Sequence, residues 1–326
     1  MFLLVSELQT VPYYRMEPFY TSLETILSIN SEQVKTLITQ FNTGDLAFFQ
    51  TYFNLLPTAK LQVSNEKNAN ANETFFVGSQ AIGAGEFGTM FKNKNNSRPF
   101  VYKRIEDYEG ANDTTSLTYL QTGFKEAIIQ VLLQSDTTYG KHICRLYKVY
   151  RDGLNFIFQM EALEITLERY IVKNRWTAVD ESIMPNIILK LVLILNYFNT
   201  KYGFFHNDLS LSNIMTVETG DQVENLKLID FGLSMVKIGE IQLGIRKPTP
   251  YDPTFIKHLI YEVRPKYRRA LEKIVALPPE TSEEELTHIL STNINQSAGA
   301  IKRNTRKRSR KTRKFRKNRK ESLRRS

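Results

Sequence analysis

The stretch Phe205-His206-Asn207-Asp208-Leu209-Ser210-Leu211-Ser212-Asn213 follows a long apolar segment, and Leu228-Ile229-Asp230-Phe231-Gly232 follows it further along the chain. Asp208 and Asn213 lie five residues apart in a polar loop and suit two tasks. The carboxylate can orient or deprotonate an acceptor hydroxyl, and the amide can help to hold Mg²⁺. Asp230 ends a predicted strand and suits a hard cation that bridges phosphate oxygens. Together the two stretches predict a site for phosphoryl transfer.

Two further features lie upstream of this loop. The run Gly83-Ala84-Gly85-Glu86-Phe87-Gly88 stands between two predicted strands, and its glycines allow backbone amides to face phosphates. Taken alone, the run is equally typical of a flexible hairpin. Lys103 shares a strand face with Val101, so a buried lysine here needs partners such as a phosphate and a carboxylate. Glu126, on the next predicted helix, is the candidate carboxylate, with an ordinary surface glutamate as the alternative.

The periodicity of apolar residues predicts the α+β class. A mostly antiparallel sheet that contains one helix comes first, and a mostly helical part follows. Strands are expected at residues 74–82, 87–92, 99–105, 143–150, 154–160, 213–217 and 226–229, and helices at 117–134, 166–173 and 182–202.

From about residue 78 to residue 232, these motifs resemble the protein-kinase superfamily. The matching parts are the Gly-rich loop, the strand lysine, H-x-D-L-x-x-x-N and D-F-G. The resemblance implies a two-lobed fold, with an antiparallel-sheet N-lobe that contains one helix and a reduced helical C-lobe. It also implies ATP and Mg²⁺ in the cleft between the lobes, and a protein substrate.

The resemblance also assigns roles to individual residues. Phe158-Gln159-Met160-Glu161-Ala162-Leu163 looks like the gatekeeper and hinge that hold adenine, with Met160 as the gatekeeper. Catalytic roles fall on Asp208, Lys103 and Asn213; nucleotide binding on Gly83, Ala84, Gly85, Glu86, Phe87, Gly88, Lys103, Glu126, Met160, Glu161 and Leu163; and metal binding on Asn213 and Asp230.

The chain departs from the family pattern at the acceptor end. Asn207 replaces the arginine that reads phosphorylation of the activation loop in the family, so we expect that switch to be absent. Ser210 stands where Ser/Thr kinases carry a lysine that contacts the γ-phosphate. No A-P-E motif follows Gly232, which predicts a truncated C-lobe. In these respects the chain is similar to the small atypical kinases of the KEOPS complex and to divergent kinases of large DNA viruses.

Three functions fit these observations. The favoured one is an active Ser/Thr-type protein kinase. The second is a small-molecule kinase or a KEOPS-kinase-like ATPase, which Ser210 and the short C-lobe keep open. The third is a pseudokinase scaffold that presents a basic tail to nucleic acid, and the intact Lys103, Asp208, Asn213 and Asp230 argue against it.

Charge is distributed unevenly along the chain. The whole sequence carries a net charge of +10, but residues 302–326 hold fifteen Lys and Arg and a single acidic residue, Glu321. The tail therefore carries +14 and the remainder −4. Such a block repels itself and predicts disorder over 296–326. It suits contact with nucleic acid or another polyanion, or a nuclear-localisation signal, and a merely solvated tail is the alternative.

The sequence predicts five parts. They are a separate helical accessory region (1–62), a polar linker (63–73), the N-lobe (74–161), the reduced C-lobe (162–295) and the basic tail (296–326). The single cysteine, Cys144, excludes a disulfide framework within the chain and fits an intracellular, cytoplasmic or nuclear location. The longest apolar run, 187–195, is too short to span a bilayer, so no membrane partner is expected.

Overall fold

The computed structural model describes residues 16–63, 75–85, 88–93, 100–105, 113–174 and 183–245, and five residues between 284 and 292. Glu86 and Phe87, most of the predicted linker, nearly all of the C-lobe beyond Ile245 and the basic tail lie outside the described residues. The predictions made for those segments therefore stay predictions.

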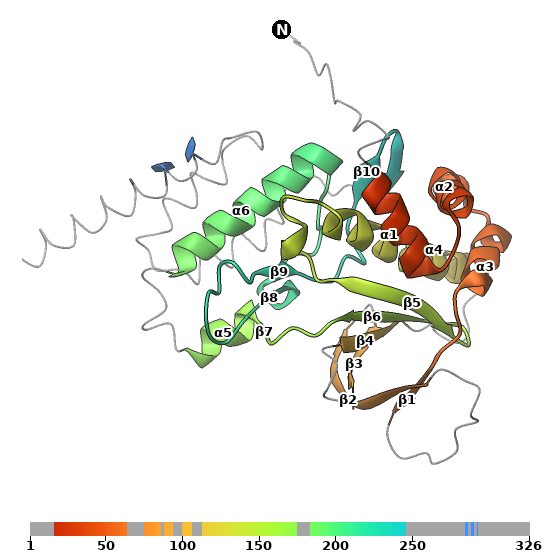
Figure 1. The fold of residues 1–326 in the computed structure, drawn as a ribbon, viewed down its shortest axis with the longest axis horizontal. Helices are drawn as coiled ribbons and strands as arrows, with labels where there is room; N and C mark the ends of the chain where they lie inside the picture. The colour runs from red at the N-terminus through yellow and green to blue at the C-terminus, as the bar shows by residue number, and fades with distance from the viewer. Residues whose placement is uncertain are drawn as a thin grey trace, which may run out of the picture.

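The described chain begins with helices, continues with a run of strands and then contains both (Figure 1). The helices and 3-10 turns are α1 (Glu17–Leu27), α2 (Ser31–Thr39), η2 (Phe41–Thr43), α3 (Leu46–Leu55), α4 (Asp113–Gln134), η3 (Gly140–His142), α5 (Leu167–Lys173), α6 (Ile183–Tyr202) and η4 (Leu211–Asn213). The strands are β1 (Lys60–Val63), β2 (Phe75–Gly85), β3 (Gly88–Asn93), β4 (Phe100–Ile105), β5 (Leu146–Asp152), β6 (Asn155–Glu161), β7 (Ile165–Thr166), β8 (Ile214–Thr216), β9 (Lys227–Leu228), β10 (Val236–Ile238) and β11 (Ile241–Leu243).

The largest sheet has six strands in the order β1-β2-β3-β4-β6-β5. Strands β2 to β6 pair antiparallel, as the sequence predicts. Successive side chains of each strand point to opposite faces of the sheet. On one face, Val101, Lys103 and Ile105 of β4 point toward the main core. On the other face, a second small core consists of Leu61, Phe91, Tyr102 and Ile157.

The segment before β2 joins the two edges of this sheet. The sequence did not reveal this connection. Strand β1 pairs parallel with β2. Just before β1, the Arg151 amide of β5 donates to the Pro57 carbonyl, and the Ala59 amide donates to the Arg151 carbonyl, both at 3.0 Å. Residues 57–63 therefore connect the β5 edge with the β2 edge, so backbone groups at both edges are paired.

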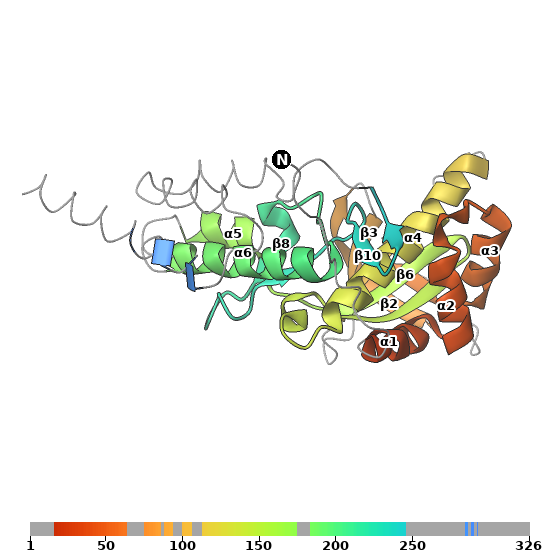
Figure 2. The ribbon, with the colours of Figure 1, turned by 90° about the horizontal axis from the view of Figure 1, so that it is seen from above.

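The N-terminal helices pack against the sheet lobe. Helix α1 contacts β5, and α3 contacts α4. Figure 2 shows all three helices beside α4 at one end of the molecule. Apolar residues of α1, α2 and α3 belong to the same buried core as those of α4. The boundary at residue 62 stays a prediction, but described residues 16–63 share a core with the sheet lobe and do not stand apart from it.

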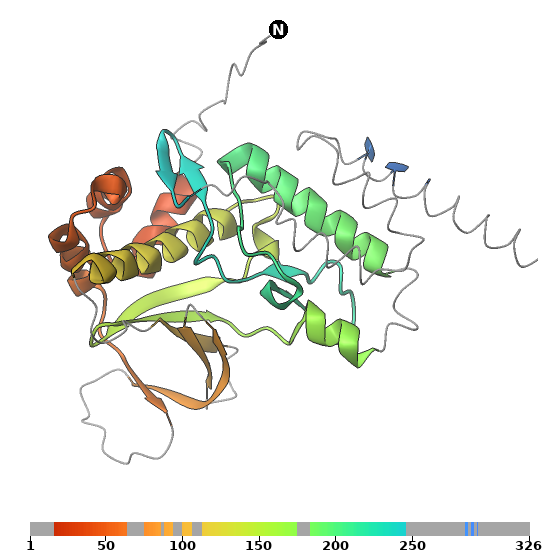
Figure 3. The same ribbon diagram turned by 180° about the vertical axis from the view of Figure 1, so that it is seen from behind.

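The described part of the second lobe holds α5, α6 and the small sheet β7-β8-β9, and the hairpin β10-β11 extends back toward the first lobe (Figures 1 and 3). Helix α6 buries Ile187, Leu191, Ile194 and Phe198, whose spacing places them on one side of the helix. None of the helices in the described segments has the length and apolar character needed to cross a membrane.

Candidate active site

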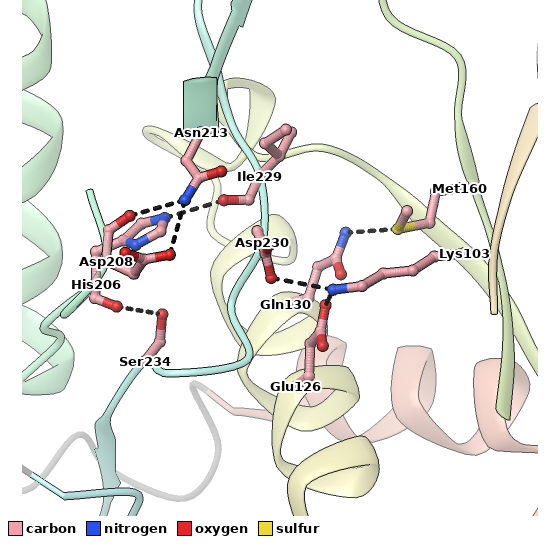
Figure 4. A network of polar contacts seen from close by, with 10 residues as sticks. All are labelled: Lys103, Glu126, Gln130, Met160, His206, Asp208, Asn213, Ile229, Asp230 and Ser234. Carbon is pink, nitrogen blue, oxygen red and sulfur yellow. Dashed lines mark hydrogen bonds and ion pairs between the residues drawn. The ribbon is translucent and has the colours of Figure 1, made fainter. Parts of the chain in front are cut away.

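Three charged side chains from distant parts of the chain meet in one cluster (Figure 4). Lys103 on β4 is 5% exposed, and Glu126 on α4 is 1% exposed. The Lys103 Nζ lies 2.7 Å from the Glu126 Oε1 and 3.0 Å from the Asp230 Oδ1. The structure thus brings together the lysine, the helix carboxylate and the D-F-G aspartate that the sequence proposed separately.

Electrostatics keep Lys103 charged in this trio. Burial disfavours the ammonium ion, but the carboxylates of Glu126 and Asp230 outweigh it and raise the pKa of Lys103 to about 12. Burial also raises the pKa of Glu126. For Asp230, burial opposes ionisation, yet Lys103 outweighs it and lowers the pKa. When both carboxylates are ionised, one ammonium ion cannot neutralise them, so the site favours an additional cation.

Asp208 and Asn213 are joined directly. The Asn213 Nδ2 donates to the backbone oxygen of Asp208 at 2.8 Å and to its Oδ2 at 3.1 Å. The Asn213 side-chain oxygen points away from Asp208 (Figure 4). The Ile229 amide donates to the Asn213 carbonyl at 3.1 Å, which holds this loop beside the strand end that carries Asp230.

His206 holds the loop in position through two hydrogen bonds. Its Nε2 donates to the Ile229 carbonyl at 3.0 Å, and its own carbonyl accepts a hydrogen bond from the Ser234 hydroxyl at 3.0 Å. The ring packs near Phe204 and Phe231, both of which are buried. Burial lowers the pKa of His206, so the imidazole is neutral near pH 7. In this geometry His206 holds the loop in position by hydrogen bonding and packing.

Asn207 has a role that the sequence did not reveal. Its backbone is left-handed, with φ 65°, and Asp230 has a similar φ of 63°. The Asn207 Nδ2 donates to the carbonyls of Leu233 and Ile245, each at 2.9 Å. Only two features of the sequence pointed to a special role: Asn207 replaces the arginine of the family pattern, and asparagine tolerates a positive φ.

The Gly-rich run forms the end of the β2-β3 hairpin. Gly85 pairs with Gly88, and Ala84 pairs with Thr89. Gly88 has a φ of 128°, and a Cβ placed there would lie 2.3 Å from the Arg104 carbonyl oxygen. A side chain at position 88 would therefore clash with backbone, so close packing alone requires this glycine.

The predicted gatekeeper and hinge, residues 158–163, cover the second half of β6 and the two residues after it. Met160 is buried opposite Val101, and its sulfur lies 3.8 Å from the Gln130 Nε2. The Glu161 carboxylate forms an ion pair with Lys227 at 2.8 Å, so its side chain is already occupied. Residues 162–164, which include Leu163, lie between β6 and β7 outside any helix or strand.

The donor set fits Mg²⁺ together with a phosphate ligand. The Asp230 side chain is 28% exposed, and the Asn213 oxygen is directed away from its own loop partner. Mg²⁺ in proteins commonly takes one or two carboxylates and completes its octahedron with water and substrate phosphates. Within the described segments, no group of three or more His, Cys, Asp or Glu could hold a metal ion alone. The phosphates would have to supply further ligands.

Comparison with known proteins gives one family. The protein kinase domain family matches residues 76–243, just over half of the 326 residues. A probable serine/threonine-protein kinase of Dictyostelium discoideum is 42% identical over 84 residues, which is 26% of this chain and 15% of that protein.

Two further relatives match longer segments at lower identity. Serine/threonine-protein kinase 33 of Mus musculus is 24% identical over 191 residues, which cover 56% of this chain and 36% of the relative. Dual specificity mitogen-activated protein kinase kinase 7 of Homo sapiens is 26% identical over 118 residues, which cover 35% of this chain and 27% of the relative. The matches thus span only a minor part of each relative's length.

Proposed function

From the premise that this chain belongs to the protein kinase family, we propose that it is an active protein kinase that transfers the γ-phosphate of ATP to Ser/Thr hydroxyls of a protein. The observation that carries the proposal is the convergence of Lys103, Glu126 and Asp230 in one ion-paired trio. Burying these charged groups costs free energy, and strongly perturbed ionisable groups cluster at functional sites.

Each group in the site has a task in this reaction. Lys103, positioned by Glu126, would align the phosphates and offset their charge, and the backbone of the Gly83–Gly88 run would face them. Asp208 would orient the acceptor hydroxyl and take up its proton. Asn213 and Asp230 would hold Mg²⁺, which when bound supplies charge stabilisation at the phosphate oxygens. The hinge groups near Glu161 and Leu163 would hold adenine.

The relatives' names support the Ser/Thr type, since two of them are named as serine/threonine-protein kinases. The alternative is a small-molecule kinase or an ATPase similar to the kinases of the KEOPS complex. This alternative rests on Ser210, which stands where Ser/Thr kinases carry a lysine, and on the short C-lobe that the sequence predicts. The Ser210 hydroxyl lies 2.7 Å from the Ser212 hydroxyl, and the two form a hydrogen bond. We also propose, from the sequence motifs, a resemblance to divergent kinases of large DNA viruses.

A labelled-ATP assay tests the proposal. Purified protein is incubated with Mg²⁺, γ-labelled ATP and a panel of basic and acidic proteins, beside the variants Asp208→Asn and Asp221→Asn. Asp221 lies in the exposed β8-β9 turn and gives a control with the same chemical change. We expect Asp208→Asn to lower the transfer rate by about 10²–10⁴-fold and Asp221→Asn to leave it unchanged.

Binding is measured separately as the thermal shift caused by Mg-ATP. A wild-type protein that neither binds Mg-ATP nor labels itself or any panel member would refute the proposed activity. Release of labelled phosphate without transfer to protein would favour the ATPase alternative. Full activity in Asp208→Asn would refute the role of Asp208.

We also propose two wider properties that rest on sequence. The partners are protein substrates and, through residues 302–326, nucleic acid or another polyanion. The location is the cytoplasm or the nucleus, with the basic tail as a nuclear-localisation signal. Microscopy of the full chain and of a chain that ends at residue 301 tests the location, and an unchanged nuclear fraction would refute the signal.

A further inference from the structure

Helix α4, which carries Glu126, is fastened to the sheet at its first half. The Tyr119 hydroxyl donates to the Ile105 carbonyl at 2.8 Å and accepts from the Phe156 amide at 3.0 Å, so it joins α4 to the ends of β4 and β6. Gly123 lies so close to the Phe156 ring that an added Cβ would sit 2.4 Å from it. One side of α4 therefore rests directly on the sheet.

The second half of α4 is fastened to the start of β5. The Gln130 Nε2 donates to the Cys144 carbonyl at 2.7 Å. Gln134 exchanges two hydrogen bonds with the backbone of Leu146, at 2.7 and 3.1 Å. These contacts hold α4 against the sheet along its length. The N-terminal helices α1 and α3 contact α4 as well.

The N-terminal helices pack aromatic side chains against α4 and against the neighbouring strand β6. Phe49 of α3 has no exposed surface, and its ring centroid lies 6.2 Å from that of Phe124 on α4. Phe41 packs edge-on against Phe49 at 5.3 Å, and Phe53 packs edge-on against Phe156 at 4.8 Å. Phe124 is two residues before Glu126, so the cluster contacts the same turn of α4 as the ion-paired trio but on a different face of the helix.

The same N-terminal segment also reaches the hairpin β10-β11. The Asn42 Nδ2, in η2, donates to the Gln242 carbonyl of β11 at 3.1 Å. The Gln121 Nε2 of α4 donates to the Phe41 carbonyl of η2 at 3.3 Å. Figures 1 and 3 show the hairpin next to these helices. The N-terminal segment therefore contacts α4, which carries Glu126, and the hairpin β10-β11, which follows Asp230 closely in sequence.

We propose that residues 16–56, named here the N-terminal brace, are a positioning element for the active site. Packing of the brace on α4 holds this helix against the sheet and thereby keeps Glu126 in contact with Lys103. Phe49 is the central positioning residue of the brace. The inference rests on the proposed function, because the arrangement that it stabilises is the one proposed to align ATP. A shift of α4 away from β4 would break the 2.7 Å ion pair and open a cavity beside Phe124.

A double-mutant cycle tests whether Phe49 acts through Glu126. The variants are Phe49→Ala, Glu126→Gln and the double substitution in the full chain, with Ile194→Ala as a buried control on α6. We expect Phe49→Ala to lower kcat/KM by about tenfold in the wild-type background but less than about twofold beside Glu126→Gln. A merely structural Phe49 would give the same fold-loss in both backgrounds, which would overturn the proposal.

Backbone hydrogen exchange of residues 113–134 gives a readout that does not need activity. At matched global stability, we expect exchange in α4 to rise in Phe49→Ala and not in Ile194→Ala. Equal exchange in the two variants would overturn the proposal. If Phe49→Ala does not fold, Phe49→Leu and Ile194→Val replace the pair. A wild-type chain without transfer would refute the proposed kinase function, while exchange would still decide whether the brace positions α4.

Discussion

Asn207 meets two structural demands at one position. Its backbone is left-handed, a conformation that asparagine and glycine tolerate better than most residues. Its single amide group donates to two carbonyls, those of Leu233 and Ile245, which flank the hairpin β10-β11. A neutral donor therefore fastens both ends of this segment, at the position where the family carries a phosphate-reading arginine.

The variant Asn207→Asp separates these two demands. It keeps the shape and the tolerance for positive φ but removes both donors and places a buried carboxylate near two carbonyl oxygens. We expect the free energy of unfolding to fall by about 1–3 kcal/mol, measured by denaturant titration at pH 7. Asn207→Gly keeps the backbone conformation and removes the side chain, so its loss should be smaller. Wild-type stability in Asn207→Asp would refute the role of the two hydrogen bonds.

Single residues differ in how well their roles can be predicted. Lys103 could be recognised because strand alternation placed a charge on an apolar face, and Glu126 because a buried lysine requires a carboxylate. The partners of Asn207 lie 26 and 38 residues away in sequence. Such hydrogen bonds leave no local pattern, so the fold must be known before they can be assigned.

The connection between α4 and β5 ties the two lobes together. His142 in η3 has no exposed surface, and its Nδ1 lies 2.8 Å from the Leu226 carbonyl. Next to it, the Cys144 amide donates to the Leu228 carbonyl at 3.0 Å. An element that follows α4 thus joins the small sheet that leads to Asp230.

His142 should make stability depend on pH. Burial lowers the pKa of His142, the Leu226 carbonyl and Glu224 oppose the shift, and Lys190 and Lys141 add to it. The unfolded chain, with a histidine pKa near 6.5, then binds a proton more readily than the folded protein. Its stabilising contribution is therefore complete above pH 6.5 and decreases as pH falls below it. Buried His206 shifts stability in the same direction.

Denaturant titrations at several pH values between 7.5 and 5 measure this effect. We expect His142→Asn, which keeps an N–H donor near the Leu226 carbonyl, to lose less stability on acidification than the wild-type protein. His288, outside the core that holds His142, offers a matched control in His288→Asn. Identical pH slopes in the wild-type protein and His142→Asn would contradict the assignment.

Secondary structure could be predicted where local chemistry decides it. Asn30 and Gln33 form a capping box that starts α2, and Gly153, with a φ of 59°, turns the hairpin β5-β6. Strand β1 could not be predicted, because four residues give too little alternation and its partner β2 lies beyond a polar segment of the sequence. For α1 the sequence predicted only a helical region over 1–62, and this helix packs on β5.

On the scale of the whole molecule, the order of motifs was sufficient to predict the fold class. A Gly-rich hairpin, a strand lysine, a helix carboxylate, a catalytic loop and D-F-G occur together in one family. The packing of residues 16–63 on the sheet lobe was not predictable, because a polar segment separates them in sequence from the strands they join. Contacts across such a separation depend on the assembled core.

The uneven charge of the chain leads to a prediction about polyanions. Residues 302–326 carry +14, and the remainder carries −4, so contact with nucleic acid should depend on the tail alone. If six to ten phosphates are neutralised, we expect the affinity for DNA to fall by about 10³–10⁵-fold between 50 and 200 mM salt. A chain that ends at residue 301 should lose this binding but keep phosphotransfer to a small peptide.

A second chain with the same tail composition in shuffled order distinguishes charge from sequence recognition. Because counterion release depends on the number of neutralised phosphates, the shuffled tail should give the same slope of log affinity against log salt concentration as the natural tail. Fluorescence anisotropy with a short labelled duplex measures all three chains. A flat salt response, or unchanged binding after truncation, would contradict the electrostatic mechanism. A steep slope that only the natural order gives would instead indicate a folded recognition surface in the tail.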